Sequence, residues 1–421
     1  MYDHSFNYVT FSKELRKSDF NKHKRLRDPI YKNGLLLNSV VSVAGGFSKC
    51  SPLAYTVIRG KKVYRVARFH DELILRKVNR NVRVVSGLKN NVRDSIVANV
   101  KNLLSEGVSY RVYRLDVKSF YESFSEDDIL NKVVLRNDVS PATKKIIGGL
   151  VSGHAMTGGT GVPRGLALSA TITEVLMRDF DKWIEIESEV FFYSRYVDDI
   201  ILITSGIESE QEFLRSVSEH LPKGLVLNHR KQFVKAVSSD VSPYKAGAAM
   251  CLLEFEYLGY KFSVFEPSSN SELKRGQHFR DVYLDIADSK VKKIKTRMSK
   301  ALLDYVRTKD FSLLVLRLRF LTSNFSVLDV DRDRKRLAGI FYNYHRVDSS
   351  VSKSLVELDA YVRKAILSSK GKVFEGFFCN TSVAQRRSLL KFSFVRGFED
   401  KTFMHFSREN LKLIQRCWAY A

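Results

Sequence analysis

Cysteine is scarce in this sequence, and long apolar runs are missing. Four cysteines occur among 421 residues, and no two of them form a Cys-x-x-Cys pair. Neither a disulfide framework nor a cysteine-based zinc site is therefore expected, and the thiols should stay reduced, as in cytoplasmic proteins. The longest apolar stretch, residues 35–43, is interrupted by polar side chains and is too short to cross a bilayer. Residues 1–17 lack the apolar core of a signal peptide, so we expect a cytoplasmic protein without a membrane partner.

Acidic side chains are also in deficit. Lysine and arginine together number 70, against 46 aspartates and glutamates, which gives a formal net charge of +24. A surface this positive repels itself unless a polyanion covers it, and nucleic acid is the usual polyanion. The hydrophobic content of 44% is ordinary for a globular protein, and the length allows two or three packed subdomains. The composition thus predicts a folded nucleic-acid-binding protein.

The central part of the sequence alternates strand-like and helix-like patterns. Residues 111–120 predict a strand that carries Asp116 on the face opposite its apolar set. Pro163 begins a helical pattern whose inner apolar stripe consists of Leu168, Ile172, Val175 and Leu176. A β-hairpin follows with its tip at residues 197–199. A further helix and a short strand at residues 225–227 come next. This order predicts an α+β fold with a ferredoxin-like layer.

Three aspartates at the predicted strand ends are suited to phosphoryl transfer. Asp116 lies near the end of one strand, and Asp198 and Asp199 occupy the hairpin tip. Two divalent ions about 4 Å apart can hold the attacking and leaving oxygens of such a reaction and neutralise the developing charge. Carboxylates supply the hard oxygen ligands that magnesium prefers, and they repel one another unless a cation lies between them. An Asp-Asp pair in a turn also has a purely conformational explanation, so the pair alone does not identify a metal site.

The order of five short motifs separates these explanations. The motifs are LDVKSFY at 115–121, GVPRGLALS at 161–169, YVDD at 196–199, NxxK at 228–231 and FEYLGY at 255–260. In this succession they resemble motifs A to E of the reverse transcriptases, and the resemblance covers about residues 55–265. It implies a right-hand polymerase of the α+β class. The implied parts are an N-terminal extension and fingers in 1–108, a ferredoxin-like palm in 109–285 with some fingers at 128–160, and an α-helical thumb and C-terminal region in 286–421.

The resemblance also implies an activity, RNA-directed DNA polymerisation from dNTPs, and a metal site for it. Asp116 and Asp198 would be the direct ligands of two Mg²⁺ ions, with Mn²⁺ as a substitute. Asp199 would be the supporting carboxylate, and the backbone carbonyl of Val117 would be a further ligand. Tyr121 matches the aromatic steric gate, whose ring collides with a ribose 2′-hydroxyl and so favours DNA synthesis. A core aromatic is the alternative explanation of Tyr121.

Other matched positions imply contacts with the incoming dNTP. The motif B turn that holds Arg164 and Gly165 would face the nucleotide and template, although the family usually has glutamine where this chain has Arg164. Lys231 matches the lysine that protonates the pyrophosphate leaving group, with a surface lysine as the alternative. Basic residues of the fingers would grip the triphosphate, with a solvated basic hairpin as the alternative. These residues are Lys61, Lys62, Arg65 and Arg68.

Primer and template contacts are expected in two regions. Tyr196 and Val197 would touch the primer end. Residues 292–309 predict a basic amphipathic helix at the position of the thumb, where its cations would meet duplex phosphates, and a solvated charged face is the alternative. Its cations are Lys292, Lys293, Lys295, Arg297 and Lys300. Beyond residue 330, tyrosines interleaved with basic residues suit stacking on unpaired RNA bases, with core packing as the alternative.

The length and the form of motif B most resemble the type 2 branch of the compact bacterial defence-associated reverse transcriptases, which are related to the abortive-infection group. That branch implies an antiphage role, a structured noncoding RNA as template and partner, and a nascent cDNA as product. Two alternatives stay open. One is template-independent, protein-primed DNA synthesis, with Tyr342, Tyr344 or Tyr420 as the acceptor. The other is a non-catalytic RNA-binding scaffold, against which the intact set of motif A and motif C residues argues.

Overall fold

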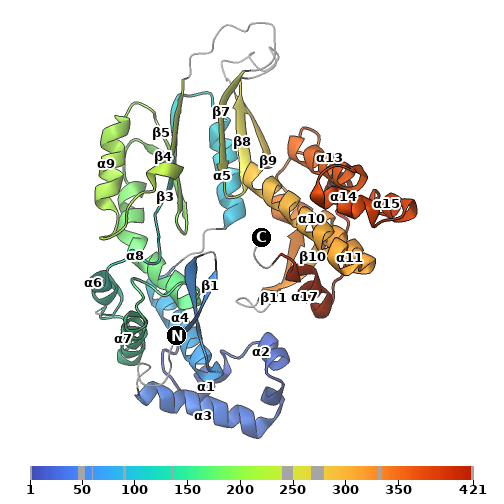
Figure 1. The fold of residues 1–421 in the computed structure, drawn as a ribbon. Coiled ribbons are helices and arrows are strands. Elements are labelled where there is room, and N and C mark those ends of the chain that lie inside the picture. Colours follow the sequence, from blue (N-terminus) through green and yellow to red (C-terminus); the bar gives the residue numbers. More distant parts are fainter. Residues whose placement is uncertain are drawn as a thin grey trace. The chain divides into compact units, whose positions relative to one another are not determined.

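The chain folds into two compact units (Figure 1). Unit 1 comprises residues 1–96 and 109–238, and unit 2 comprises residues 97–108 and 239–421. The computed structural model describes residues 2–45, 53–58, 60–88, 92–134, 136–238, 250–266, 279–329 and 334–418. Cys50 and Tyr420, a candidate priming residue, lie outside the described residues.

The N-terminal part of unit 1 consists of helices around a β-hairpin. Strands β1 and β2 pair in antiparallel register, with Lys61 opposite Ile58 and Lys62 opposite Val57, so the two lysines point to opposite faces of the hairpin. The elements are α1 (Tyr8–Ser12), α2 (Lys17–Lys22), η1 (Lys24–Arg27), α3 (Pro29–Gly45), β1 (Leu53–Ile58), β2 (Lys61–Val66), α4 (Phe69–Ser86) and the beginning of α5 (Arg93–Leu104).

A four-stranded antiparallel sheet with strand order β4-β5-β3-β6 forms the centre of unit 1. Its strands are β3 (Tyr110–Asp116), β4 (Val190–Tyr196), β5 (Asp199–Thr204) and β6 (Phe233–Val237). The associated helices are α6 (Glu126–Ile129), η3 (Leu130–Val134), α7 (Pro141–Met156), α8 (Ala167–Glu185), α9 (Glu210–His220) and η4 (His229–Lys231). The succession β3-α8-β4-β5-α9-β6, with β5 between the parallel strands β3 and β4, is the ferredoxin-like arrangement, which confirms the sequence prediction.

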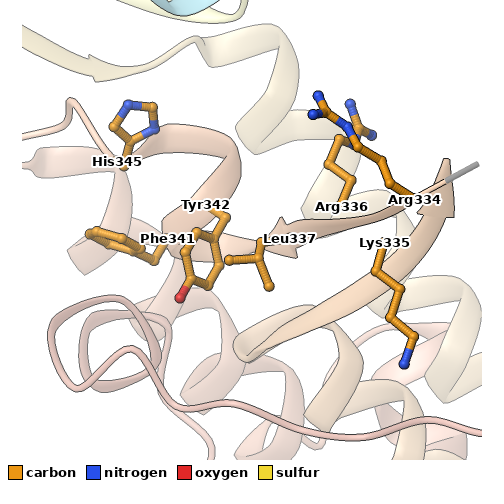
Figure 2. A pocket seen from close by; sticks show the side chains of 7 residues that line it. All are labelled: Arg334, Lys335, Arg336, Leu337, Phe341, Tyr342 and His345. Carbon is orange, nitrogen blue, oxygen red and sulfur yellow. The ribbon is translucent and has the colours of Figure 1, made fainter. Parts of the chain in front are cut away.

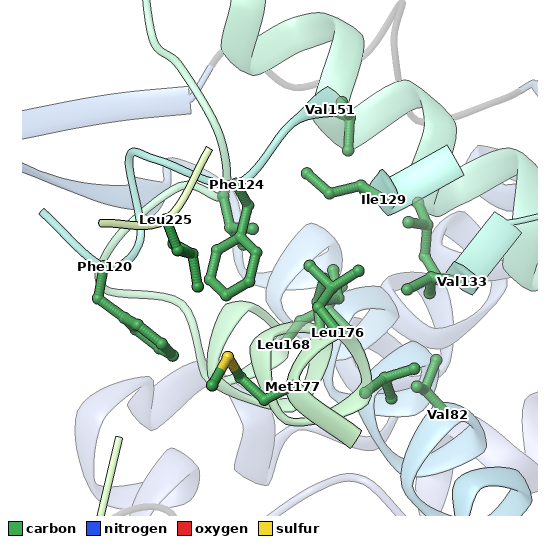
Figure 3. Packing of buried hydrophobic residues seen from close by; sticks show 14 of the residues in the cluster. Val82, Phe120, Phe124, Ile129, Val133, Val151, Leu168, Leu176, Met177 and Leu225 are labelled. Carbon is green, nitrogen blue, oxygen red and sulfur yellow. The ribbon is translucent and has the colours of Figure 1, made fainter. Parts of the chain in front are cut away.

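Helix α8 packs its apolar stripe into the core of unit 1. The four residues predicted to form that stripe, Leu168, Ile172, Val175 and Leu176, are each 5% exposed or less, which confirms the prediction. Figure 3 shows side chains of α8 meeting those of α4, α7 and the segment after β3, where Phe124 also packs. This core fixes the helix beneath the strands that carry the predicted catalytic carboxylates.

Two local predictions were wrong. The helix predicted from Pro163 begins at Ala167, because Gly161 and Gly165 adopt positive φ angles of 65° and 105° and keep residues 161–166 in a turn. The strand predicted at 225–227 is reduced to a single bridge between Leu227 and Val117. The chain then turns through η4, so the fourth strand of the sheet is β6.

Unit 2 combines two small sheets with helices. A three-stranded antiparallel sheet has the order β7-β8-β9, and β10 pairs with β11 in a separate hairpin. The elements are β7 (Cys251–Tyr257), β8 (Tyr260–Phe265), β9 (Asp281–Ile286), α10 (Asp288–Thr308), α11 (Phe311–Thr322), β10 (Asn324–Asp329), β11 (Arg334–Gly339), α12 (Ile340–Tyr344), α13 (Lys353–Leu367), α14 (Lys372–Cys379), α15 (Val383–Leu389), α16 (Phe394–Glu399) and α17 (Arg408–Arg416).

Arg280 joins residues 105–108 to the rest of unit 2. Its backbone N–H donates to the carbonyl of Ser105 at 2.7 Å, and its buried guanidinium donates to the carbonyls of Glu106 and Val108. Among the helices described, none is long and apolar enough to cross a membrane. The boundary of unit 1 at Ser238 lies inside the palm expected at 109–285, and the division into fingers, palm and thumb stays a prediction.

Candidate active site

The three aspartates of motifs A and C come together at one end of the central sheet. Asp116, the last residue of β3, is the direct cross-strand partner of Asp199, the first residue of β5. Directly opposed residues of an antiparallel pair project from the same face of a sheet, with Cβ atoms about 5 Å apart. Asp198 lies in the two-residue turn between Tyr196 and Asp199, and its carbonyl accepts the N–H of Val117 at 3.1 Å. Two strands distant in sequence therefore present their carboxylates at one edge.

Val197, the other residue of this turn, has a positive φ of 63°. A β-branched residue rarely adopts this conformation, which costs about 1–3 kcal/mol and persists only where the surroundings impose it. The tight turn holds Asp198 directly beside the end of β3. Tyr196, which precedes Val197, is 39% exposed, so its ring is available for contact with another molecule.

Asp116 is held by two side chains of the segment before β6. Its side chain is buried at 7% exposure, Lys231 Nζ lies 2.7 Å from Oδ1, and Asn228 Nδ2 donates to Oδ2 at 2.9 Å. The backbone N–H of Asn228 also donates to the Asp116 carbonyl at 2.7 Å. The structure thus brings the predicted residue Lys231 to the carboxylate cluster. Asn228 belongs to the NxxK motif, from which its contact with Asp116 could not be inferred.

Burial raises the pKa of Asp198, and the nearby Asp116 carboxylate raises it further. Burial likewise raises the pKa of Asp199, and the charge of Asp198 adds to the rise. Ionising both side chains therefore costs free energy that a neighbouring cation would recover. Perturbed carboxylates grouped at a strand edge are typical of functional sites.

The donor chemistry of this cluster fits a divalent cation, because its side-chain donors are hard oxygens from two adjoining strands. Within the described residues, no group of three or more His, Cys, Asp or Glu side chains is arranged to enclose a metal ion. Both oxygens of Asp116 are instead engaged by Lys231 and Asn228. Positive charge at Asp116 is supplied here by the ammonium group of Lys231.

Tyr121, the predicted steric gate, forms a cluster with Arg164 and Glu122. The guanidinium carbon of Arg164 lies 4.9 Å from the centroid of the Tyr121 ring. Two parallel hydrogen bonds of 2.9 and 3.1 Å join the same guanidinium to the Glu122 carboxylate. Burial opposes ionisation of Glu122, but the hydrogen bond and charge of Arg164 outweigh it and lower the pKa of this carboxyl. The arginine that departs from the family pattern is therefore locked against motif A by a charged pair.

The glycines of motif B permit this close approach. A Cβ atom at Gly161 would lie 2.4 Å from the carbonyl oxygen of Tyr121. A Cβ atom at Gly165 would lie 2.6 Å from the side chain of Val63 and 2.8 Å from the carbonyl oxygen of Tyr64. Both glycines also have positive φ, so any other residue would be strained there. Gly165 thus serves the contact between motif B and the β1–β2 hairpin.

A cavity of about 340 Å³ lies beside this cluster, within unit 1. Two of the four predicted triphosphate cations, Lys61 and Lys62, line it together with Arg164. Arg65 and Arg68 are not among its lining residues, and Arg68 instead pairs with Asp71 at 3.0 Å. The remaining lining residues are Gly60, Tyr64, Ser119, Glu122, His154, Gly158, Gly159, Thr160 and Val162.

Arg195 was not among the predicted site residues. It is 4% exposed on β4, and its guanidinium lies 2.8 Å from Glu174 and 2.7 Å from Asp181 of α8. Its Nη1 atom also donates to the carbonyl of Val197 at 3.1 Å. Arg195 therefore ties the YVDD turn to α8. The available sequence signal was an arginine directly before this motif, with two acids seven residues apart on one face of the next helix upstream.

The basic residues predicted for the thumb lie on α10 of unit 2, where they differ in their surroundings. Lys292 is exposed, whereas Lys295 pairs with Glu357 and lies 5.4 Å from the centroid of the Tyr361 ring. Arg297 lies over the ring of Trp418 at 5.7 Å. The side chains of Lys293 and Lys300 are partly buried. Part of the predicted phosphate-binding stripe is thus used for packing within unit 2.

Comparisons with known proteins agree with the motif order. Residues 68–262 match the family described as reverse transcriptase (RNA-dependent DNA polymerase). No curated protein matches the chain. Among solved structures, telomerase from Candida tropicalis with a TWJ fragment of telomeric RNA aligns with a TM-score of 0.33 and 14% identity, over 92% of this chain and 65% of that one.

Two further telomerase structures align at similar levels. Apo telomerase from Candida tropicalis, truncated from its C-terminal domain, gives a TM-score of 0.32 and 14% identity over 55% of this chain and 58% of that one. Telomerase from Candida albicans with a TWJ fragment of telomeric RNA gives 0.29 and 12% over 82% of this chain and 53% of that one. The chain thus spans less than two thirds of the length of each of these proteins. Residues 68–262, just under half of the chain, thus match the reverse transcriptase family, and the α+β architecture agrees with that of the right-hand polymerases.

Proposed function

We propose that this protein extends a 3′-hydroxyl with dNTPs by two-metal phosphoryl transfer, using RNA as its template. The observation that carries the proposal is the convergence of Asp116, Asp198 and Asp199 at one sheet edge, in a region that matches the reverse transcriptase family. Two bound Mg²⁺ ions, or Mn²⁺ ions in their place, would activate the 3′-hydroxyl and neutralise the charge that develops on the phosphates. Asp116 and Asp198 would be their direct ligands, supported by Asp199 and the Val117 carbonyl.

The remaining roles concern the nucleotide and the primer. Lys61 and Lys62 border one cavity, which suits the triphosphate. Arg164 also borders it, but its charge is paired with Glu122, and it supports Tyr121, which excludes the ribose 2′-hydroxyl. Arg65 and Arg68 would contact the triphosphate only after a local rearrangement, since neither lines that cavity. Lys231, whose side chain is 57% exposed, would donate the proton that pyrophosphate needs as it leaves. Tyr196 and Val197 would support the primer end.

The template is proposed to be a structured noncoding RNA, copied in the cytoplasm for antiphage defence. This rests on the resemblance of motif B to the type 2 defence-associated branch and on a net charge of +24, which suits a large RNA partner. The product would be a cDNA that stays with the enzyme during synthesis. Template-independent synthesis from a protein tyrosine is the main alternative.

The metal assignment is tested by Asp198→Ala in the full-length protein purified with its bound nucleic acid. Incorporation of labelled dNTPs should fall by at least about 1000-fold, since the mutation removes a direct metal ligand. Binding of the co-purifying RNA should stay within about twofold, because Asp198 is not proposed to contact the template. Retained synthesis in this variant would refute the metal assignment.

Sequencing of the wild-type product tests the template. We expect cDNA complementary to one discrete RNA that co-purifies with the protein. A product without a complementary template, covalently attached to protein, would support the alternative.

A further inference from the structure

The hairpin of β10 and β11 borders a second cavity, which lies in unit 2 and has a volume of about 530 Å³. Helix α12 follows β11 directly and supplies the other side of the cavity (Figure 2). The cavity combines cationic and aromatic side chains. Its lining residues are Arg334, Lys335, Arg336, Leu337, Phe341, Tyr342 and His345.

Three consecutive cations of β11 provide the charge. Arg334, Lys335 and Arg336 are all exposed, and Arg334 is the direct cross-strand partner of Asp329. Arg334 and Arg336 project together from one face of the strand, and Lys335 projects from the other (Figure 2). Because side chains alternate along a strand, Lys335 shares its face of β11 with Leu337. The sequence also contains Asp331 and Asp333, which lie outside the described residues.

Aromatic side chains of α12 provide the second component. Tyr342 lies beside Leu337, which is 45% exposed, and His345 is also exposed (Figure 2). Phe341 packs edge-on against Tyr342 and Phe398, with ring centroids 5.3 and 5.2 Å apart, and so supports the Tyr342 ring from within. A partly exposed ring beside an apolar side chain and near cations suits stacking by a nucleobase.

Asn324 makes this arrangement rigid. Its fully buried side chain accepts the backbone N–H groups of Phe341 and Tyr342 through Oδ1, and it donates to the carbonyls of Gly397 and Thr402 through Nδ2. One side chain therefore fixes the start of α12 to two other segments of unit 2. The aromatic side chains need little ordering when a ligand binds, which favours affinity.

We propose that this cavity binds an unpaired stretch of polynucleotide, with bases stacked on Tyr342 and the adjoining phosphate held by Lys335, which projects from the same face of β11 as Leu337. A duplex keeps its bases stacked inside and cannot use the aromatic side of the site, so single strands should be preferred. The shared chemistry of base and phosphate fits both RNA template and DNA product. The inference does not rest on the proposed polymerase activity, because binding requires no synthesis.

The test measures binding in the full-length Asp198→Ala protein, freed of co-purifying nucleic acid, so that catalysis plays no part. Fluorescently labelled single strands of about 12 nucleotides, one of RNA and one of DNA, are titrated with this protein and with the same protein carrying Tyr342→Ala. Loss of one stacked base should weaken binding about 5- to 100-fold. Tyr342→Phe keeps the stacking ring and should bind within about twofold of the parent.

The contribution of Lys335 is measured separately, through the salt dependence of binding. Lys335→Ala should reduce the slope of log affinity against log salt by about 0.7, the value for one single-strand phosphate contact. Arg363→Ala, an exposed arginine on α13 outside the cavity, is the matched control and should change neither affinity nor slope. A duplex of the same length should be insensitive to Tyr342→Ala.

Direct attachment of a photoreactive strand identifies the site. A 5-iodouridine-labelled strand should cross-link to Tyr342 or His345 on irradiation, and the peptide is identified by mass spectrometry. Unchanged single-strand affinity in Tyr342→Ala, with cross-links confined to unit 1, would overturn the proposal. Binding of an acidic peptide that competes with the strand and is lost in Tyr342→Ala would do so as well, since it would assign the cavity to a protein partner.

Discussion

Among single residues, Arg164 departs from the family pattern, and other side chains of the protein pair with its charge. The family usually has glutamine at this position, and a freely placed arginine there would add positive charge beside the nucleotide. Here the guanidinium is held by Glu122 through two hydrogen bonds and covers the face of the Tyr121 ring. The charge of Arg164 is therefore matched inside the protein, and its planar group is used to support the proposed gate.

Arg164→Gln should weaken the preference for dNTPs over NTPs about two- to tenfold. The change removes a cation–π contact worth about 0.5–2 kcal/mol and leaves Tyr121 freer to move away from a 2′-hydroxyl. The measurement is the ratio of kcat/KM for a dNTP to that for the matching NTP. Arg164→Lys keeps the charge but loses the planar fork, so its ratio should fall between those of wild type and Arg164→Gln.

Tyr121→Ala is the reference for this experiment and should lower the same ratio further than either Arg164 variant. Glu122→Gln should act in the direction of Arg164→Gln, because it weakens the bonds that hold the guanidinium. Should Arg164→Gln retain the wild-type ratio while Tyr121→Ala loses it, Arg164 would have no positioning role.

At the scale of elements, the YVDD hairpin depends on its attachment to α8. The pKa of Arg195 is raised well above its usual value, since hydrogen bonds and charge from Asp181 and Glu174 outweigh the cost of burying it. The same guanidinium holds the carbonyl of Val197, whose strained backbone precedes Asp198. Removing one member of a buried charge cluster leaves the others unpaired, which is costly.

Arg195→Met should lower the free energy of unfolding by about 3–5 kcal/mol, because it leaves Glu174 and Asp181 without their partner. Arg195→Lys, and separately Glu174→Gln, should be milder and should fold. In these variants kcat should fall more than KM rises, since the hairpin is displaced and the nucleotide cavity is left intact. Denaturant unfolding and steady-state kinetics measure both effects.

The exposed pair of Arg215 and Glu219 on α9 is the matched control. Its atoms are 3.8 Å apart at the surface, so Arg215→Met should cost less than about 0.5 kcal/mol. Equal costs at the two positions would mean that Arg195 does not clamp the hairpin.

The elements that could be predicted from sequence are those whose pattern is local. Alternation predicted β3 and the hairpin of β4 and β5, and helical spacing predicted the buried stripe of α8. The predicted start of α8 and the predicted position of the fourth strand were wrong, because positive φ angles at two glycines and the turn at η4 override local propensity. The contacts of Asn228 and Glu122 could not be predicted, since their partners lie 112 and 42 residues away and depend on the fold.

For the whole molecule, the net charge of +24 is larger than the charge that is free to contact the phosphates of a nucleic acid. Many cations are engaged inside the protein, as shown by buried Arg76 with Asp19 and by buried Arg317 with Asp304. Counterion release depends only on cations that reach phosphates. The affinity for a polyanion should therefore depend on particular exposed residues rather than on the sum of charges.

Two lysines one turn apart on α10 can show whether net charge or particular exposed cations control the affinity for nucleic acid. Lys292 is exposed, whereas Lys295 is paired with Glu357 and lies near the Tyr361 ring. If the thumb assignment holds, Lys292→Ala should reduce the salt slope of template–primer binding by about 0.9, the value for one duplex phosphate contact. Lys295→Ala should change that slope by less than about 0.3 and act on stability instead, because its charge is already matched. Both variants change the net charge by the same amount, so equal slopes would show that bulk charge controls binding.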